Sequence, residues 1–227
     1  MATTYNPRIV TNGLVLCLDA GNTQSYPGSG TTWTDLSGNG NNGTLTNGPT
    51  FSSANGGTIV FDAVNDRVTS VTTIPPAGNV SVFSWIYPTS FNGMWNIIVT
   101  KWFDPTGLDF HFALKSAAGN GTNVRQNLYT TSNSDIYGTT IFSTNTWYYV
   151  GFTLVNGGTL TFYKNAVEDG ISSPVSRTTQ NSTLYIADNR GGFGLGGRIP
   201  QVSIYNRALS ATEVAQNFNA LRGRFGV

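Results

Sequence analysis

Charged residues are scarce in this sequence. Asp, Glu, Lys and Arg make up only 10% of its 227 residues, and the formal net charge is +1, whereas about a quarter of an ordinary soluble domain is charged. The Lys and Arg residues stand singly between Arg8 and Arg224. Because binding to nucleic acid or to an anionic membrane needs clustered positive charge, we expect neither partner.

Cysteine and histidine occur once each, as Cys17 and His111. A single Cys excludes an intrachain disulfide, and the apolar neighbours of Cys17 predict a buried, unreactive thiol. His111 lies between Phe110 and Phe112. Without a second His or a Cys cluster, we expect it to pack on a sheet rather than bind a metal.

Long apolar runs are absent as well. No segment approaches 18 consecutive apolar residues, and the first residues contain no apolar signal-peptide core. We therefore expect a protein that is made and folded in a cytoplasm, is not secreted through a signal peptide and is not inserted in a membrane.

Regular alternation of apolar residues is what the sequence does contain. In Trp147–Asn165, apolar residues occupy every second position on both sides of Asn156-Gly157-Gly158. Side chains alternate between the two faces of a strand, and glycine suits a tight turn, so this segment predicts a long β-hairpin. Its shared apolar face consists of Val150, Phe152, Leu154, Leu160 and Phe162.

Further segments with this period predict about eleven to thirteen strands in one all-β domain, a two-sheet antiparallel jelly-roll sandwich. Leu14 to Asp19 is apolar on both faces, which predicts a central strand, and Ala20–Pro49 is a predicted loop held by Trp33 and Leu36. The predicted strands are Gly13–Asp19, Thr58–Asp62, Arg67–Val71, Val80–Tyr87, Asn96–Thr100, Asp109–Lys115, Val124–Thr130, Thr183–Asp188 and Arg198–Asn206.

One short C-terminal helix is predicted over Ala211–Leu221. Ser210 and Glu213 have the spacing of a capping box, and Val214, Phe218 and Leu221 form one apolar stripe. The expected organisation is an extended arm over residues 1–12, a jelly-roll domain over 13–221 and a tail over 222–227.

Six segments follow one another along the chain: Gly13–Ala20, Trp33–Thr44, Val60–Val68, Phe83–Ile86, Trp147–Thr153 and Ile204–Ser210. In this order they resemble the landmarks of laminin G-like domains, which belong to the concanavalin A-like lectin and glucanase superfamily. The resemblance covers nearly the whole chain and implies a jelly roll that serves either as a binding module or as a glycosidase. The two ends, the opening arm and Glu213–Gly226, look more narrowly like single-domain versions among virion structural proteins of tailed bacteriophages.

A glucanase of this kind would need two carboxylates about 5 Å apart. Glu168 and Glu213 are the only glutamates, one in a predicted turn and the other in the helix cap. Asp62 and Asp66 could pair, but aspartates in a turn usually accept backbone N–H bonds. We therefore expect no enzymatic activity and assign no catalytic residue.

Many proteins of the resembled family hold Ca²⁺, which binds six to eight oxygens. Four aspartates near strand ends could contribute, but Pro200-Gln201 stands where relatives often carry an Asp. We expect no cofactor and assign no metal ligand, with calcium as the alternative. The four aspartates are Asp19, Asp35, Asp62 and Asp66.

Sugar binding uses an aromatic ring against the C–H face of the sugar and polar groups for its hydroxyls. We expect such a site in two loops, Phe91–Trp95 and Trp102–Thr106, on either side of one short strand. The alternative is that both tryptophans pack in the core or between subunits. The candidate residues are Asn92, Trp95, Trp102 and Asp104.

Our leading functional hypothesis is a non-enzymatic virion protein on a capsid or tail surface, which forms homo-oligomers, contacts capsid or tail proteins and binds host or environmental glycans. The alternative is a free bacterial lectin or adhesin module. Because both ends carry apolar residues outside the sandwich pattern, we expect them to contact a partner chain. The residues expected in that contact are Tyr5, Ile9, Phe225 and Val227.

Overall fold

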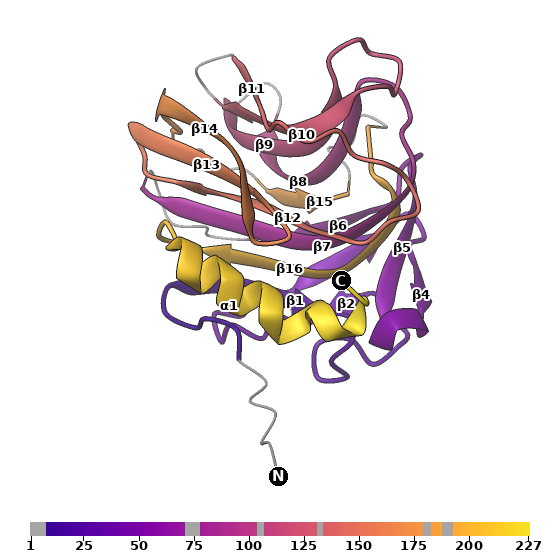
Figure 1. The fold of residues 1–227 in the computed structure, drawn as a ribbon. Coiled ribbons are helices and arrows are strands. Elements are labelled where there is room, and N and C mark those ends of the chain that lie inside the picture. The colour runs from indigo at the N-terminus through magenta and orange to yellow at the C-terminus, as the bar shows by residue number, and fades with distance from the viewer. Residues whose placement is uncertain (1–7, 71–77, 104–106, 131–133, 179–182, 188–192) are drawn as a thin grey trace.

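Two antiparallel β-sheets stack face to face, and one helix lies on the outer side of one of them (Figure 1). The computed structural model describes residues 8–70, 78–103, 107–130, 134–178, 183–187 and 193–227. Within these ranges, no helix is long and apolar enough to cross a membrane. The predicted all-β sandwich with one short C-terminal helix is confirmed.

Sheet A is the helix-covered sheet. Strand β1 (Leu14–Asp19) pairs with β16 but stands outside the linear order of the other strands. The other strands are, in spatial order, β14 (Val167–Val175), β13 (Gly158–Lys164), β12 (Tyr148–Leu154), β7 (Val80–Ser90), β16 (Gly196–Tyr205), β5 (Thr58–Asp62) and β4 (Thr50–Ser52).

Sheet B lies on the other side of the sandwich, and its outer side faces away from the helix (Figure 1). Its strands are, in spatial order, β11 (Asp135–Tyr137), β10 (Val124–Thr130), β9 (Gly107–Ser116), β8 (Trp95–Phe103), β15 (Leu184–Ile186), β6 (Arg67–Ser70), β3 (Gly43–Thr46) and β2 (Thr32–Trp33).

The main hydrophobic core fills the space between the sheets. All five residues of the predicted hairpin face belong to it, and β12 pairs with β13 in the expected register. Phe152 makes edge-on contacts with Phe110 and Phe112 of sheet B, with ring centroids 5.9 and 5.3 Å apart. The hairpin therefore lies at the centre of the core, as its period predicts.

A second core joins sheet A to helix α1 (Ala211–Leu221). The two faces of β7 explain it, because Val80 and Val82 face the main core while Phe83 and Trp85 face the helix. Trp85 stacks on Phe218, with ring centroids 5.5 Å apart. The helix begins at the predicted capping box, in which Ser210 Oγ accepts from Glu213 N–H and Glu213 Oε2 from Ser210 N–H.

The segment Gly13–Asp19 was predicted to be a central strand covered on both faces; it is covered on both faces, but it lies at an edge of the sheet. Strand β1 pairs with β16 alone, although its middle residues are buried. The free edge is covered by the segment after β2, in which Asp35 Oδ1 accepts from Cys17 N–H at 2.9 Å and Asn41 Nδ2 donates to the Val15 carbonyl at 2.7 Å. Side chains of a loop thus satisfy the backbone groups of this edge, which would otherwise be open to pairing.

Five strands were not predicted: β2, β3, β4, β11 and β14. The first three have two to four residues each, which is too short to show a period. Two of them, β2 and β3, lie in the predicted loop Ala20–Pro49, where Trp33 is fully buried as expected. Glu168 lies in strand β14 rather than in a turn, so that prediction is corrected. The short 3₁₀ helices are η1 (Ala54–Gly56) and η2 (Arg222–Arg224).

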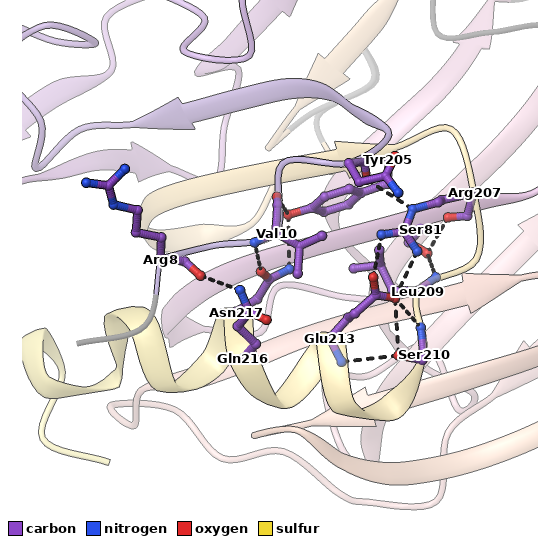
Figure 2. Close-up of polar contacts among 11 residues, drawn as sticks. Arg8, Val10, Ser81, Tyr205, Arg207, Leu209, Ser210, Glu213, Gln216 and Asn217 are labelled. Atoms are coloured by element: carbon purple, nitrogen blue, oxygen red, sulfur yellow. Dashed lines mark hydrogen bonds and ion pairs between the residues drawn. The ribbon is translucent and has the colours of Figure 1, made fainter. Parts of the chain in front are cut away.

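Both chain ends, where the structure describes them, pack on their own domain. Val10 is buried in the second core, and its N–H donates to Asn217 Oδ1 at 2.7 Å (Figure 2). Phe225 stacks on Trp85 at 4.3 Å between centroids and is only 5% exposed. Phe225 is thus used inside the domain, which corrects its assignment to a partner contact. Ile9 is half-buried and Val227 exposed, while Tyr5 lies outside the described residues.

Candidate functional site

The two tryptophans of the predicted sugar site lie far apart. Trp95 and Trp102 are near opposite ends of strand β8, and seven residues of strand span roughly 23 Å. Both are strand residues, whereas they were expected in two loops on either side of a short strand. That they share one sugar site stays a prediction. Asn92 is exposed in the loop before β8, and its N–H donates to Asn96 Oδ1 at 3.1 Å. Asp104 lies outside the described residues.

The register of β8 to β11 arranges Trp95 in a grid on the outer side of sheet B. Alternate residues of these strands, such as Phe110, Phe112 and Leu128, face the main core, so the residues between them face outward. We call the outward set the outer grid. Its first row is Trp95, Lys115 and Arg125; the second is Ile97, Ala113, Asn127 and Tyr137; the third is Thr100, His111, Tyr129 and Asp135.

Trp95 is the aromatic centre of the outer grid. Its ring meets His111 edge-on with centroids 4.8 Å apart and Tyr129 edge-on at 6.3 Å. Lys115 Nζ lies 3.7 Å from the indole centroid, a cation–π contact. Trp95 is half-buried. The indole is therefore held rigidly, with one face covered by the ammonium group and part of the ring still open to solvent.

Lys115 and Asp135 form a close ion pair within the outer grid. Lys115 Nζ lies 2.5 Å from Asp135 Oδ2, and Asn127 Nδ2 donates to the other oxygen of Asp135 at 3.2 Å. Burial, and then the positive charge of Lys115, lowers the pKa of His111 to about 3. His111 is thus neutral at physiological pH, with Thr100 Oγ1 3.0 Å from its Nδ1. The prediction that His111 packs on the sheet is confirmed.

One buried polar atom of the outer grid has no partner. Asn127 Oδ1 is buried and accepts no hydrogen bond in the structure, although Asn127 Nδ2 donates to Asp135 and to the carbonyl of Ile136. A buried acceptor without a partner is costly, so such atoms often mark a place for water or ligand.

A pocket of about 350 Å³ lies beside the first two rows. Its volume falls at the lower end of ordinary ligand pockets, about 300 to 1,000 Å³. The loop that forms one wall is held by Asn120 Oδ1, which accepts from the N–H of Thr122 at 3.1 Å and from its hydroxyl at 2.6 Å. The pocket is thus largely preformed. It is lined by Ala117, Ala118, Asn123, Arg125 and Tyr137.

The four aspartates considered for calcium each serve a local structure. Asp19 pairs with Arg224 at 2.8 Å, and Asp35 accepts from the backbone at the edge of β1. Asp62 Oδ1 accepts from the N–H of Val64, and this bond lowers the pKa of Asp62. Burial raises the pKa of Asp66. Among the described residues, no group of three or more His, Cys, Asp or Glu side chains is placed to hold a metal ion.

A buried ionic cluster that the sequence did not predict lies near the start of β9. Asp109 accepts two bonds from Arg177, both 2.7 Å, and lies 3.6 Å from Lys101 Nζ. All three side chains are at most 3% exposed. Asp109 and Arg177 are 68 residues apart in sequence, so no local pattern relates them, and the cluster ties sheet B to the segment that follows β14.

Several solved structures share this fold. The binding domain of Paraclostridial Mosquitocidal Protein 1 is 20% identical with a TM-score of 0.71, over 92% of this chain and 52% of that one. Domain 4 of AbnA, an extracellular GH43 arabinanase of Geobacillus stearothermophilus solved with arabinotriose, is 19% identical with a TM-score of 0.69, over 90% and 97%. The receptor-binding domain of botulinum neurotoxin D is 14% identical with a TM-score of 0.68, over 92% and 52%. The chain thus spans about half the length of the two toxin domains.

Sequence comparison identifies the family. No curated protein sequence matches the chain. Residues 61–215, more than half of the chain, match the laminin G-type family model described as "Concanavalin A-like lectin/glucanases superfamily". This match includes β8 to β11 and therefore the outer grid. The chain belongs to the concanavalin A-like lectin/glucanases superfamily.

Proposed function

We propose that this protein is a non-enzymatic carbohydrate-binding module whose site is the outer grid of sheet B with the adjoining pocket. The observation that carries the proposal is the placement of Trp95, Tyr129 and Tyr137 among amide and charged side chains next to a preformed pocket. Sugars bind through C–H contacts with aromatic rings and through directed hydrogen bonds. The outer grid supplies both.

The contacts inside the outer grid support this function. Because Lys115 and His111 hold Trp95 in place, a sugar would meet an ordered ring, and little rotamer entropy would be lost on binding. Tyr137 contributes a hydroxyl at the pocket, and Asn127 Oδ1 is an unused acceptor beneath the same face. The fold also occurs in an arabinanase domain that was solved with arabinotriose.

The positions of the two glutamates support a binding role over hydrolysis. Glu213 is bound by Arg207 and by the cap of helix α1, and the bond from Arg207 lowers its pKa to about 2. Glu168 lies on β14 of sheet A, away from the outer grid. We therefore propose no hydrolytic step, and an assay for sugar release with a broad set of polysaccharides is expected to show none.

A glycan array followed by calorimetry on the best ligand tests the binding site. Tyr137→Ala should abolish or strongly weaken binding while the melting temperature changes little, because Tyr137 is only half-buried. Val167→Ala, which truncates an exposed side chain on β14 of sheet A, is the matched control. Binding that is unchanged by Tyr137→Ala and by Trp95→Ala would place the sugar site elsewhere.

A phage virion role is the second candidate function. Its support is the resemblance of the two ends to phage virion proteins, together with the low charge of the chain, which allows close packing against other subunits. A virion lectin would use the same sugar site in an assembled particle. The neighbouring genes distinguish the candidates: capsid, portal and tail genes support the virion role, and their absence favours a free lectin.

A further inference from the structure

Two cations oppose each other in the first row of the outer grid. Lys115 of β9 is the register partner of Arg125 on β10. Like charges directly opposite on neighbouring strands destabilise a sheet unless other groups neutralise them. The protein therefore keeps an unfavourable pair on the face that we assign to ligand binding.

Only one of the two cations is neutralised. Lys115 turns toward Asp135, 2.5 Å away, and over the ring of Trp95. Among the described residues, Arg125 has no carboxylate partner, and its half-buried side chain lines the pocket. The pocket thus has one uncompensated guanidinium group in its wall.

We propose that Arg125 binds the carboxylate of an acidic sugar in this pocket. The proposal rests on the carbohydrate-binding function above and names its ligand class. A guanidinium group donates two parallel N–H bonds to a carboxylate, which gives both charge and orientation. An acidic sugar would neutralise the charge that Lys115 and Asp135 leave unbalanced.

The other pocket residues fit the same ligand. Ala117 and Ala118 have short side chains, which leave room for a sugar ring against Arg125. Burial and the nearby charge of Asp135 raise the pKa of Tyr137. Its hydroxyl therefore keeps its proton at physiological pH and can donate to the ligand. Asn123 adds an amide at the same pocket wall.

Matched sugars provide the test. The full chain is titrated with oligosaccharides that end in glucuronic, galacturonic, mannuronic or sialic acid, and with the neutral counterparts of each. We expect at least one acidic ligand to bind more tightly than its neutral counterpart, and salt to weaken only the acidic one. Arg125→Gln should raise the Kd of the acidic ligand by about 10- to 100-fold and weaken the neutral one much less, so that the preference for the acidic ligand is lost.

Two further variants separate charge from fold. Arg125→Lys keeps the charge but loses the paired donors, so its affinity should fall between those of the wild type and Arg125→Gln. Arg222→Gln removes an exposed charge beyond helix α1 and should leave binding unchanged. Thermal melts confirm that each variant is folded.

The outcomes distinguish the ligand class from the function. Neutral sugars that bind as tightly as acidic ones, with no effect of Arg125→Gln, would overturn the acidic-ligand proposal and leave the lectin function standing. Sulfated sugars bound in place of every carboxylate sugar would also overturn it. If neither neutral nor acidic sugars bind, the carbohydrate-binding function itself fails.

Discussion

Replacement of Asn217 by alanine should destabilise the protein although the residue lies far from the main core. Asn217 is 2% exposed and lies on helix α1 between the N-terminal arm and strand β16 (Figure 2). Its Oδ1 accepts from Val10 N–H at 2.7 Å, and its Nδ2 donates to the Tyr205 hydroxyl at 3.0 Å. The Tyr205 hydroxyl in turn donates to the Val10 carbonyl at 3.0 Å. These three buried bonds form a closed ring.

The size of the effect follows from the groups that the mutation leaves without partners. Asn217→Ala removes the acceptor of a buried backbone N–H, which costs about 1 to 3 kcal/mol, and also the bond to Tyr205, which contributes about 0.5 to 1.5 kcal/mol. We expect a total loss of about 2 to 4 kcal/mol in the free energy of unfolding. Gln216→Ala is the matched control, since Gln216 Nε2 donates to the Arg8 carbonyl at an exposed position, and it should cost less than about 1 kcal/mol.

Urea unfolding monitored by tryptophan fluorescence measures both variants. Trp85 and Trp147 lie in the second core, so the signal reports the region that Asn217 stabilises. Amide exchange at Val10 provides a local measurement, because its N–H should become unprotected in Asn217→Ala before the domain unfolds. Equal, small losses in the two variants would refute the argument that the arm is part of the folded domain.

Three further predictions concern the cores and pH. Phe152→Ala should cost about 3 to 5 kcal/mol in urea melts, because it empties the centre of the main core. Phe225→Ala should also cost about 3 to 5 kcal/mol, and a loss below about 1 kcal/mol would mean that the C-terminal end does not pack on Trp85. Below pH 6.5 the unfolded chain binds a proton at His111 and the folded chain, with a pKa of about 3, does not. Stability should therefore fall by about 1.4 kcal/mol per pH unit from pH 6 to 4.5, a slope that His111→Gln should remove.

The sequence could predict those elements whose period is long enough to read. The hairpin around Asn156-Gly157-Gly158 shows period two over more than a dozen residues, and its faces are as predicted. Helix α1 begins and ends at the predicted residues, because Ser210 and Glu213 form a cap that depends only on local spacing. Local signals of this kind survive in the fold because they agree with the tertiary contacts.

The sequence could not predict contacts between distant segments. Val10 and Asn217 are 207 residues apart, and the apolar residues of the arm indicate that it is covered without indicating by which surface. The edge of β1 is similar, because Asp35 and Asn41 satisfy backbone groups of a strand about 20 residues earlier. An extended segment carries no sign of which surface will cover it.

The candidate site was predicted in part, because Trp95 was proposed as a sugar-binding residue on the basis of its aromatic side chain. Lys115, Arg125 and Tyr137 were missed because only the register of β8 to β11 brings them to the same face. A shift of one residue in that register would turn every one of these side chains to the other face. Register depends on the packing of Phe110, Phe112 and Leu128 in the main core, so the site is a consequence of the core rather than of any local motif.

The two outer faces of the sandwich therefore have different uses. On sheet A, aromatic residues such as Phe83 and Trp85 are covered by helix α1 and by the two chain ends, which leaves that face little surface for a ligand. On sheet B, the outer grid mixes aromatic rings with charges, leaves the buried acceptor Asn127 Oδ1 without a partner, and includes Arg125, which has no carboxylate partner among the described residues. Buried polar atoms without partners also occur on sheet A, at Trp85 Nε1 and the Tyr149 hydroxyl, but both residues belong to the second core beneath helix α1. The outer grid, which adjoins a pocket, is therefore the face on which we propose that a ligand binds.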